Sequence, residues 1–270
     1  DEDSGFCADR LDGKHYTDIL KDIEDATEDL IPEFKLGGVN INRENIEDIV
    51  KRLLNGEPLQ YILGYSYFCD LKIGVDSNVL IPRPETEELC RLIIERHSDY
   101  APKILDVCSG SGCIALALKN GIHEAYVEGV DISSGAISVA RKNAKRLNIN
   151  VEFNEYDVIT DTPKIVNSYD IIVSNPPYIC QFEKEKMERN VLDNEPHIAL
   201  FVEDENPLIF YDKIAELGHS VLKSGGNLFF EINPLFYKEL TEMLISKGYT
   251  NIEVINDINE RKRFIACAKI

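Results

Sequence analysis

The sequence has no run of about 18 apolar residues, no C-x-x-C pair and no excess of basic residues, and each absence excludes a class of protein. Without such a run there is no candidate transmembrane helix, and the first residues show no signal-peptide pattern. The seven cysteines are scattered and odd in number, which is typical of reduced thiols and not of disulfides or a zinc site. We therefore expect a cytoplasmic protein with no metal and no membrane contact.

The charge balance is strongly acidic. Asp and Glu number 48 against 29 Lys and Arg, which gives a net charge of −19. Such a field repels a phosphate backbone unless a local basic patch overrides it, so nucleic acid is disfavoured as a partner. Hydrophobic residues make up 44% of the 270 residues, which is enough to bury a sizeable core. The length suits one ordinary α/β domain with a small additional one.

The N-terminal part of the chain has helical patterns. Apolar residues recur at helical spacing between Tyr16 and Leu30, and again between Ile46 and Leu54 after a start signal at Asn42. We therefore expect a small helical domain over residues 1–65. Residues 66–82 change character and predict a short hairpin that links this domain to the next one.

Residues 83–270 begin with a helix pattern and then, from Lys103, alternate between strand and helix patterns. A helix begins at Pro84 and runs to about His97. The expected strands are 104–107, 126–132, 151–153, 170–174, 227–232, 252–255 and 264–268, and the other expected helices are 113–119, 136–147, 207–222 and 235–247. This alternation predicts an α/β domain over residues 83–270, with a mostly parallel seven-stranded sheet and an antiparallel last strand. The polar insertion at 180–206 follows a strand end, where functional loops commonly lie.

A strand that leads into a glycine-rich turn is the first candidate site. The turn, residues 108–112, lets a ligand approach backbone N–H groups closely, although it can also be only a tight connection. Asp131 ends the next strand, where a carboxylate can accept hydrogen bonds from both ribose hydroxyls of a nucleoside. Its alternative role is a helix cap. Because Ser133 can cap that helix, we expect Asp131 to be free for a ligand.

The residues around this turn bear on the choice of nucleoside cofactor. Gly110 and Gly112, with Ala115 in the position of a third glycine, are compatible with a dinucleotide. Asp106 favours a methionine-bearing cofactor, because an acid before the turn would repel a pyrophosphate and attract a sulfonium or amino group. Asp157, at the end of the third strand, can accept from an adenine amino group or can be only a loop carboxylate.

The segment Asn175-Pro176-Pro177-Tyr178 ends another strand, at the sheet edge where ligands bind. Because prolines donate no hydrogen bonds, the segment presents acceptors: the Asn175 side-chain oxygen and the Pro176 carbonyl. An amide nitrogen is a poor nucleophile, and two acceptors can hold its N–H bonds while its lone pair points at a methyl group. Tyr178 can pack on a planar amide or base. The segment thus indicates methyl transfer to nitrogen, and its simpler interpretation is a proline-rich turn.

The sequence resembles class I methyltransferases, and among them the protein-(glutamine-N5) methyltransferase family that modifies peptide chain release factors. The resemblance lies in residues 56–64 (GEPLQYILG), 80–87 (LIPRPETE), 105–112 (LDVCSGSG), 140–144 (ARKNA) and 174–179 (SNPPYI). The Asn-Pro-Pro-Tyr motif is shared with DNA adenine methyltransferases, whereas segment 80–87 is far more specific.

This resemblance implies a Rossmann-like fold that binds S-adenosyl-L-methionine and releases S-adenosyl-L-homocysteine. The implied catalytic residues are Asn175, Pro176 and Tyr178, and these three with Pro177 would hold the glutamine amide. The helical domain would dock the release factor, and we expect the enzyme to act as a monomer. The implied cofactor-binding residues are Asp106, Cys108, Ser109, Gly110, Ser111, Gly112, Asp131, Asp157, Val158 and Asn175.

Two residues depart from the family pattern. Cys108 stands where the family usually has glycine, which implies an altered backbone or crowding at the methionine end of the cofactor. Val158 stands where the family usually has an aromatic residue beside the adenine. Residues 193–196 (DNEP) also resemble a family segment, and their simpler interpretation is a capped loop.

Three alternatives remain open from the sequence: methylation of a glutamine in a ribosomal protein, methylation of an amino group of adenine or cytosine, and a catalytically silent cofactor-binding scaffold. A nucleic-acid substrate calls for a basic face and a target-recognition domain, and neither is visible. A scaffold has no need for the converging acceptors at residues 175–178.

Overall fold

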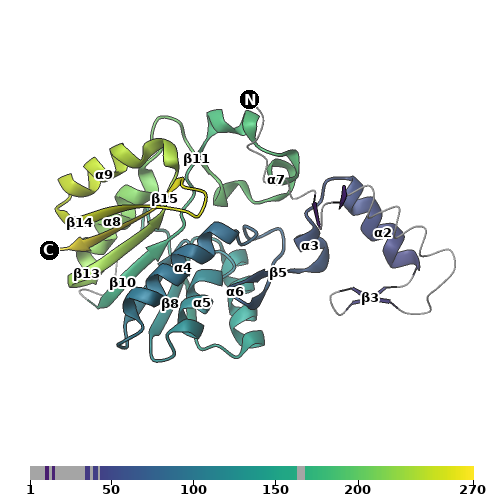
Figure 1. Cartoon of the computed structure of the whole chain (residues 1–270), viewed down its shortest axis with the longest axis horizontal. Coiled ribbons are helices and arrows are strands. Elements are labelled where there is room, and N and C mark those ends of the chain that lie inside the picture. Colours follow the sequence, from purple (N-terminus) through teal and green to yellow (C-terminus); the bar gives the residue numbers. More distant parts are fainter. Residues whose placement is uncertain (1–9, 12–13, 16–33, 37–38, 42, 163–167) are drawn as a thin grey trace. The chain divides into compact units, whose positions relative to one another are not determined.

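The computed structural model describes residues 10–11, 14–15, 34–36, 39–41, 43–162 and 168–270 (Figure 1). The chain forms two compact units, residues 1–63 and residues 64–270. Within the described ranges, none of the helices combines the length and the apolar character that a transmembrane span requires.

The described part of the first unit contains two helices and two short strand pairs. The helices are α2 (Arg43–Leu54) and α3 (Leu59–Leu63), and the antiparallel pairs are β1 (Arg10–Leu11) with β2 (Lys14–His15) and β3 (Phe34–Leu36) with β4 (Val39–Ile41). The helix expected over 46–54 is thus confirmed, and the strand pairs were not expected. The other expected helix, between residues 16 and 30, lies outside the described residues.

Helix α2 ends at a glycine. Gly56 has a φ of +83°, a left-handed conformation that costs glycine little, and its N–H donates to the Leu53 carbonyl at 2.9 Å. Arg52 then makes two hydrogen bonds to the Glu57 carboxylate, at 2.8 and 2.5 Å. These contacts explain the local role of the glycine and acid in segment 56–64.

A seven-stranded sheet forms the centre of the second unit. Its order is β14-β15-β13-β10-β7-β8-β9, and all neighbours are parallel except β15, which is antiparallel to both β13 and β14. The expected mostly parallel sheet with an antiparallel last strand is confirmed. The strands are β7 (Lys103–Val107), β8 (Tyr126–Asp131), β9 (Glu152–Glu155), β10 (Tyr169–Ser174), β13 (Leu222–Glu231), β14 (Tyr249–Asn256) and β15 (Lys262–Lys269).

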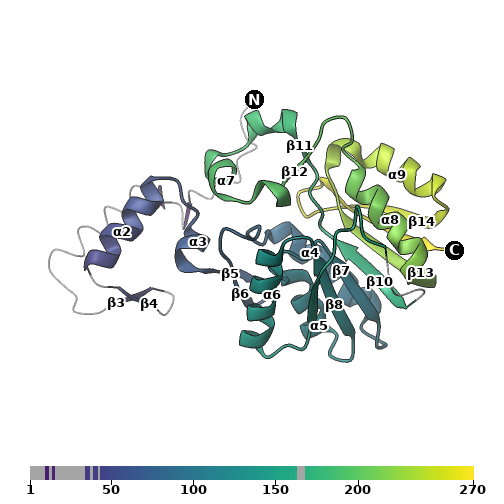
Figure 2. The same cartoon turned by 180° about the vertical axis from the view of Figure 1, so that it is seen from behind.

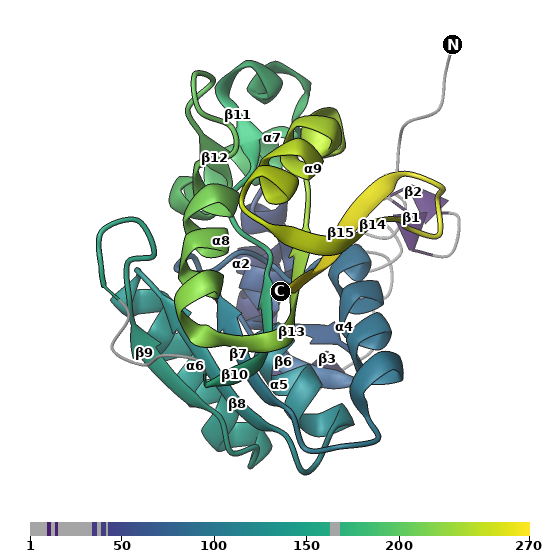
Figure 3. The same ribbon diagram turned by 90° about the vertical axis from the view of Figure 1, so that its left-hand side faces the viewer.

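The sheet is covered by helices on both faces (Figure 3). Successive side chains of a strand point to opposite faces, so Leu228 and Phe230 of β13 join the buried cluster that includes α8, while Phe229 contacts the ring of His97 on α4. Each such burial stabilises the fold by about 1.5–3 kcal/mol. The helices are α4 (Pro84–His97), α5 (Cys113–Gly121), α6 (Ser134–Leu147), α8 (Ile209–Val221) and α9 (Tyr237–Ser246).

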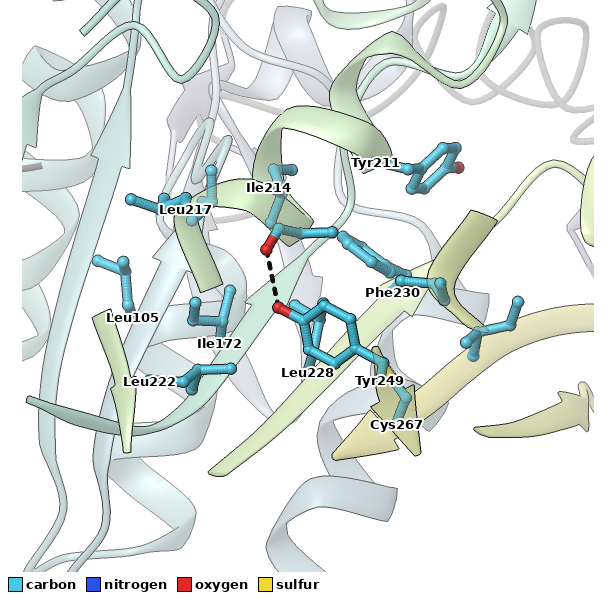
Figure 4. Close-up of a cluster of buried hydrophobic side chains, with 14 of the residues drawn as sticks. Leu105, Ile172, Tyr211, Ile214, Leu217, Leu222, Leu228, Phe230, Tyr249 and Cys267 are labelled. Carbon is cyan, nitrogen blue, oxygen red and sulfur yellow. Dashed lines mark hydrogen bonds between the residues drawn. The ribbon is translucent and has the colours of Figure 1, made fainter. Parts of the chain in front are cut away.

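The cluster beneath α8 also contains a hydrogen bond that fastens β14 to the helix. The hydroxyl of Tyr249 donates to the carbonyl of Ala215 at 2.8 Å (Figure 4). Tyr249 is 3% exposed, so its hydroxyl needs a partner inside the protein. The bond therefore makes burial of this large ring favourable.

A hairpin precedes the sheet and belongs to the same compact unit. It consists of β5 (Tyr65–Phe68) and β6 (Leu71–Gly74), joined by a two-residue turn whose residues both have positive φ. Asn143 of α6 holds it, because its side chain exchanges hydrogen bonds with both backbone groups of Gly74 at 2.7 and 2.9 Å. The hairpin was expected to extend to residue 82. It ends at Gly74, and the apolar residues beyond it pack as irregular chain.

The insertion after β10 contains short elements (Figure 2). Its two strands pair in parallel. They are β11 (Ile179–Cys180) and β12 (Phe201–Val202), and between them lie η1 (Gln181–Lys186), α7 (Arg189–Asn194) and η2 (His197–Ala199). A further short helix, η3 (Pro234–Phe236), precedes α9.

Candidate functional site

A cavity of about 300 Å³ opens at the carboxyl ends of β7, β8 and β10. In a parallel sheet of this kind, ligands bind where the strand order reverses, so that the connections after two neighbouring strands lead to opposite sides. Here that point lies between β7 and β10. The cavity is lined by Asn78, Val79, Leu80, Pro82, Arg83, Thr86, Val107, Cys108, Ser109, Gly110, Ser111, Cys113, Ile114, Asp131, Ile132, Ser133, Ala136, Tyr156, Asp157, Val158, Ile159, Asn175, Pro177, Ile198, Ala199 and Phe210.

The glycine-rich turn supplies one wall. Cys108, Gly110 and Gly112 all have positive φ, of 62°, 53° and 78°. Gly112 does not line the cavity, unlike the other residues of the turn. Its absence of a side chain is needed for packing, because a Cβ there would lie 2.6 Å from the ring of Phe153.

Cys108 carries a side chain in a conformation that favours glycine. The left-handed region costs a non-glycine residue about 1–2 kcal/mol, so the backbone at this position is strained. Burial raises the pKa of the Cys108 thiol, and the nearby carboxyls of Asp131 and Asp106 act in the same direction. The thiol is thus neutral, and it gives no indication of nucleophilic chemistry.

Asp131 lines the cavity, and it is less free than expected. Its Oδ2 accepts a hydrogen bond from the Gly110 N–H at 2.8 Å, and its Oδ1 accepts one from the Ser133 N–H at 2.9 Å. Ser133 does cap α6, because its hydroxyl accepts from the Ala136 N–H at 3.2 Å. Each carboxylate oxygen has a second lone pair, so Asp131 can still accept from a ligand while it shapes the turn.

Asp106 differs from the expectation that it faces the ligand. It is fully buried beneath the turn and does not line the cavity. Its Oδ2 accepts from the Ala115 N–H at 3.1 Å, and its Oδ1 has no partner in the described part of the chain. Burial raises the pKa of this carboxyl well above its ordinary value.

Asp157 and Val158, in the loop after β9, both lie on the cavity wall. The Asp157 carboxylate is engaged by its own loop, because Oδ1 accepts from the Ile159 N–H at 2.9 Å and Oδ2 from the Thr160 hydroxyl at 2.7 Å. Tyr156 supplies there the aromatic ring that Val158 lacks.

Three isoleucines of the cavity wall were not predicted as site residues from the sequence. Ile132, Ile159 and Ile198 are 52%, 40% and 58% exposed, although large apolar side chains are usually covered. Ile132 directly follows Asp131 at the end of β8, and Ile159 lies two residues after Asp157 in the loop that follows β9, positions that could have indicated them. Together they offer apolar surface that a planar base can cover.

Asn175 brings the second motif to the cavity. Its Nδ2 donates to the Thr86 hydroxyl at 3.3 Å, and its Oδ1 accepts no hydrogen bond from the described residues. Pro177 also lines the cavity, whereas Pro176 and Tyr178 do not. The Tyr178 hydroxyl donates to Glu231 Oε1 at 3.0 Å, and its partly buried ring packs against the core of the second unit.

Residues 193–196 acquire a role through Glu195, which is 4% exposed. Its Oε1 accepts from Arg83 at 2.5 Å, and its Oε2 accepts from the Ile81 N–H at 3.0 Å. Glu195 therefore fastens the insertion to segment 81–83. Both contribute wall residues, Ile198 from the first and Arg83 from the second.

The polar groups and the apolar surface of the cavity fit an adenosine-containing ligand with a polar tail. The Ser109 hydroxyl is buried and makes no hydrogen bond within the described ranges, and the Asn175 oxygen is equally unpaired. Asp131 offers further acceptor capacity, and the isoleucines offer apolar surface. Among the residues that the structure describes, there is no cluster of His, Cys, Asp and Glu able to hold a metal ion.

This arrangement of sheet, turn and cavity is typical of the Rossmann-like fold of class I methyltransferases. Residues 85–197 match the family described as "Methyltransferase small domain". A solved methyltransferase from Pyrococcus furiosus has the same fold, with a TM-score of 0.55 over 83% of this chain and 98% of that chain at 16% identity. The expected fold class is thereby confirmed.

Curated relatives identify the family more closely. A release factor glutamine methyltransferase of Bacteroides thetaiotaomicron is 46% identical over 223 residues, which cover 83% of this chain and 80% of the relative. One of Flavobacterium psychrophilum is 41% identical over 87% of this chain and 83% of the relative. The chain belongs to the release factor glutamine methyltransferase family.

Proposed function

We propose that this chain transfers a methyl group from S-adenosyl-L-methionine to the side-chain amide nitrogen of a glutamine in a peptide chain release factor. The observation that carries the proposal is the unpaired Oδ1 of Asn175 on the cavity wall. The names of the relatives supply the substrate class.

The turn and the strand ends would hold the cofactor. Asp131 would accept from the ribose hydroxyls, Ser109 and Gly110 would bind the methionine part, and Ile132 and Tyr156 would offer surface to the adenine. When bound, the cofactor supplies an electrophilic methyl group on a sulfonium.

The substrate amide is positioned by acceptors. Asn175 Oδ1 and the Pro176 carbonyl would accept its two N–H bonds and so fix the plane of the amide, with the lone pair of nitrogen, perpendicular to that plane, directed toward the methyl group. Both oxygens also stabilise the positive charge that develops on nitrogen. The nitrogen loses its proton after transfer, so no strong base is required in the site.

The release factor is gripped at a second surface. We assign this docking to the helical domain, residues 1–65, with the hairpin region 66–82 as the linker to the methyltransferase domain, residues 83–270. A net charge of −19 favours a protein partner with a basic face and disfavours nucleic acid. We place the reaction in the cytoplasm, with the chain acting as a monomer.

The test is transfer of labelled methyl from S-adenosyl-L-methionine to separate candidates: an intact unmethylated release factor, a short peptide carrying its glutamine loop, ribosomal proteins and DNA. We expect efficient labelling of the intact factor and far weaker labelling of the peptide, because a peptide lacks the second docking surface. Preferential labelling of a ribosomal protein or of DNA would replace the substrate assignment. The absence of any labelling would contradict the enzymatic function.

A further inference from the structure

Glu231 is a buried carboxylate behind the Asn-Pro-Pro-Tyr segment. It ends β13 and is 2% exposed. Two hydroxyls donate to it, that of Thr86 to Oε2 at 2.6 Å and that of Tyr178 to Oε1 at 3.0 Å. It does not line the cavity, and neither the cofactor contacts nor the substrate acceptors explain why an acid is buried there.

The hydrogen-bond directions around Thr86 are fixed by this acid. A hydroxyl has a single hydrogen, and Thr86 gives it to Glu231. Toward its other neighbour Thr86 can therefore only accept, and the group it accepts from is the Nδ2 of Asn175 at 3.3 Å. A carboxamide carries its donor and its acceptor on opposite branches, so the oxygen of Asn175 is left for the cavity.

We propose that Glu231 and Thr86 are positioning residues that fix the Asn175 carboxamide with its oxygen toward the substrate nitrogen. This inference rests on the proposed function, because it concerns how the same site holds a glutamine amide. Both residues act through Asn175: Glu231 does not line the cavity, and Thr86, on the cavity wall, acts by accepting from the Asn175 amide.

The consequence of losing the relay is a wrongly turned amide. Without an acceptor at Thr86, the two orientations of Asn175 become similar in energy, and in the reversed one its NH₂ group faces the NH₂ group of the substrate. Two donors repel one another there, and the substrate amide loses an acceptor. Turnover falls as a result, while the cofactor contacts at the turn and at Asp131 are untouched.

The environment of Glu231 is suited to an acceptor. Burial raises the pKa of its carboxyl, while the hydroxyls of Thr86 and Tyr178 and the charge of Arg263 favour the ionised form. Arg263 is itself held by Asp257, whose Oδ2 accepts from its Nε at 3.2 Å. The charge that stabilises Glu231 is thus fixed in place.

The test compares Thr86→Val with Thr86→Ser in the full chain. Valine keeps the shape of the side chain and removes the hydroxyl, whereas serine keeps the hydroxyl. We expect Thr86→Val to lower kcat for the intact release factor by about 10–100-fold. We expect Thr86→Ser to stay within about threefold of the wild type, and the calorimetric Kd for S-adenosyl-L-methionine to change by less than about twofold in both variants.

Thr241→Val is the matched control, because Thr241 lies on α9 away from the cavity and its hydroxyl donates to the Tyr237 carbonyl in its own helix. A double-mutant cycle adds a readout that general destabilisation would not move. In the Asn175→Ala background, Thr86→Val should lower kcat by less than about twofold further, because the amide that it orients is gone.

Three results would overturn the relay: a Thr86→Val enzyme within about twofold of wild-type kcat, a Thr86→Ser enzyme as slow as Thr86→Val, or full additivity with Asn175→Ala. If Thr86→Val fails to fold, as its melting temperature would show, the kcat of Thr86→Ser alone tests the proposal. A tenfold loss with serine would contradict the proposal, and retained turnover would support it. A wild-type chain that does not methylate the factor would refute the proposed function instead.

Discussion

The carboxylate of Glu195 lies 2.5 Å from the guanidinium of Arg83, and its second oxygen accepts a hydrogen bond from the Ile81 N–H. The Glu195 side chain is 1% exposed, whereas that of Arg83 is 33% exposed. The insertion at 180–206 is thereby fastened to the segment that precedes α4, and the two together form part of the cavity wall.

We predict that Glu195→Ala lowers the free energy of unfolding by about 1–3 kcal/mol, because it leaves the Ile81 N–H and the Arg83 charge without their partner. It should also weaken cofactor binding, since both segments line the cavity. Urea denaturation and calorimetry measure the two effects. Glu216→Ala, which removes an exposed carboxylate from Lys213 and Lys247, is the control and should cost less than about 1 kcal/mol. Equal losses in the two variants would contradict the role given to Glu195.

Cys108 offers a test of backbone strain. Residue 108 has a φ of +62°, a conformation in which any side chain has a steric cost. Cys108→Gly removes this cost, whereas Cys108→Ala keeps it. We predict that the glycine variant is more stable than the alanine variant by about 1 kcal/mol, and that it keeps its activity. Thermal or urea unfolding of both proteins checks the difference. A glycine variant that binds cofactor but is inactive would show that the thiol takes part in the reaction.

Asp131 ends β8 and Asp157 lies in the loop after β9. Both line the cavity, and their side chains are differently engaged. Asp131→Ala should weaken binding of S-adenosyl-L-methionine by about 1.5–3 kcal/mol, because a ligand loses a charged acceptor and Gly110 loses its support. Asp157→Ala should weaken binding less, because that carboxylate is held by Ile159 and Thr160 of its own loop. Calorimetry ranks the two. The reverse order would show that Asp157 contacts the cofactor.

Because Asp106 is buried, we predict that the free energy of unfolding depends on pH. Burial raises the pKa of its carboxyl in the folded protein above the unfolded value of about 3.9, so its contribution is full below that value and is lost as pH rises through the folded pKa. Asp106→Asn keeps an acceptor for the Ala115 N–H and does not titrate. We expect the wild type to lose stability relative to this variant as the pH rises above about 3.9, by up to about 1.4 kcal/mol per pH unit. A stability difference that does not change with pH above this value would contradict the raised pKa of Asp106.

Local patterns in the sequence predicted the sheet well. The apolar runs of β7 and β10 are short-range signals, because parallel strands buried on both faces consist largely of apolar residues. The capping serine of α6 is also a short-range signal. The glycine-rich turn and Asn175 were placed correctly at one sheet edge, because chain direction alone brings the carboxyl ends of parallel strands together.

Sequence patterns could not predict contacts between residues far apart in the chain. Glu195 and Ile81 are separated by 114 positions, and Glu231 and Thr86 by 145, so no periodicity links them. The apolar residues after Gly74 fit a strand pattern, and tertiary packing uses them as irregular chain. Asp106 and Asp131 look alike in the sequence, and only the fold shows that one lies beneath the turn and the other on the cavity wall.

In the proposed reaction, Asn175 holds a glutamine amide for methyl transfer. The most direct measurement is the single-turnover rate of methylation of an intact release factor at saturating S-adenosyl-L-methionine, with mass spectrometry locating the methyl group. We predict one added methyl on a glutamine with the wild type, and for Asn175→Ala a rate reduced by the equivalent of about 2–4 kcal/mol. Asn175→Asp should also be slow, because its charge favours the sulfonium before transfer as much as in the transition state. Rates within tenfold of the wild type for both variants would contradict the claim.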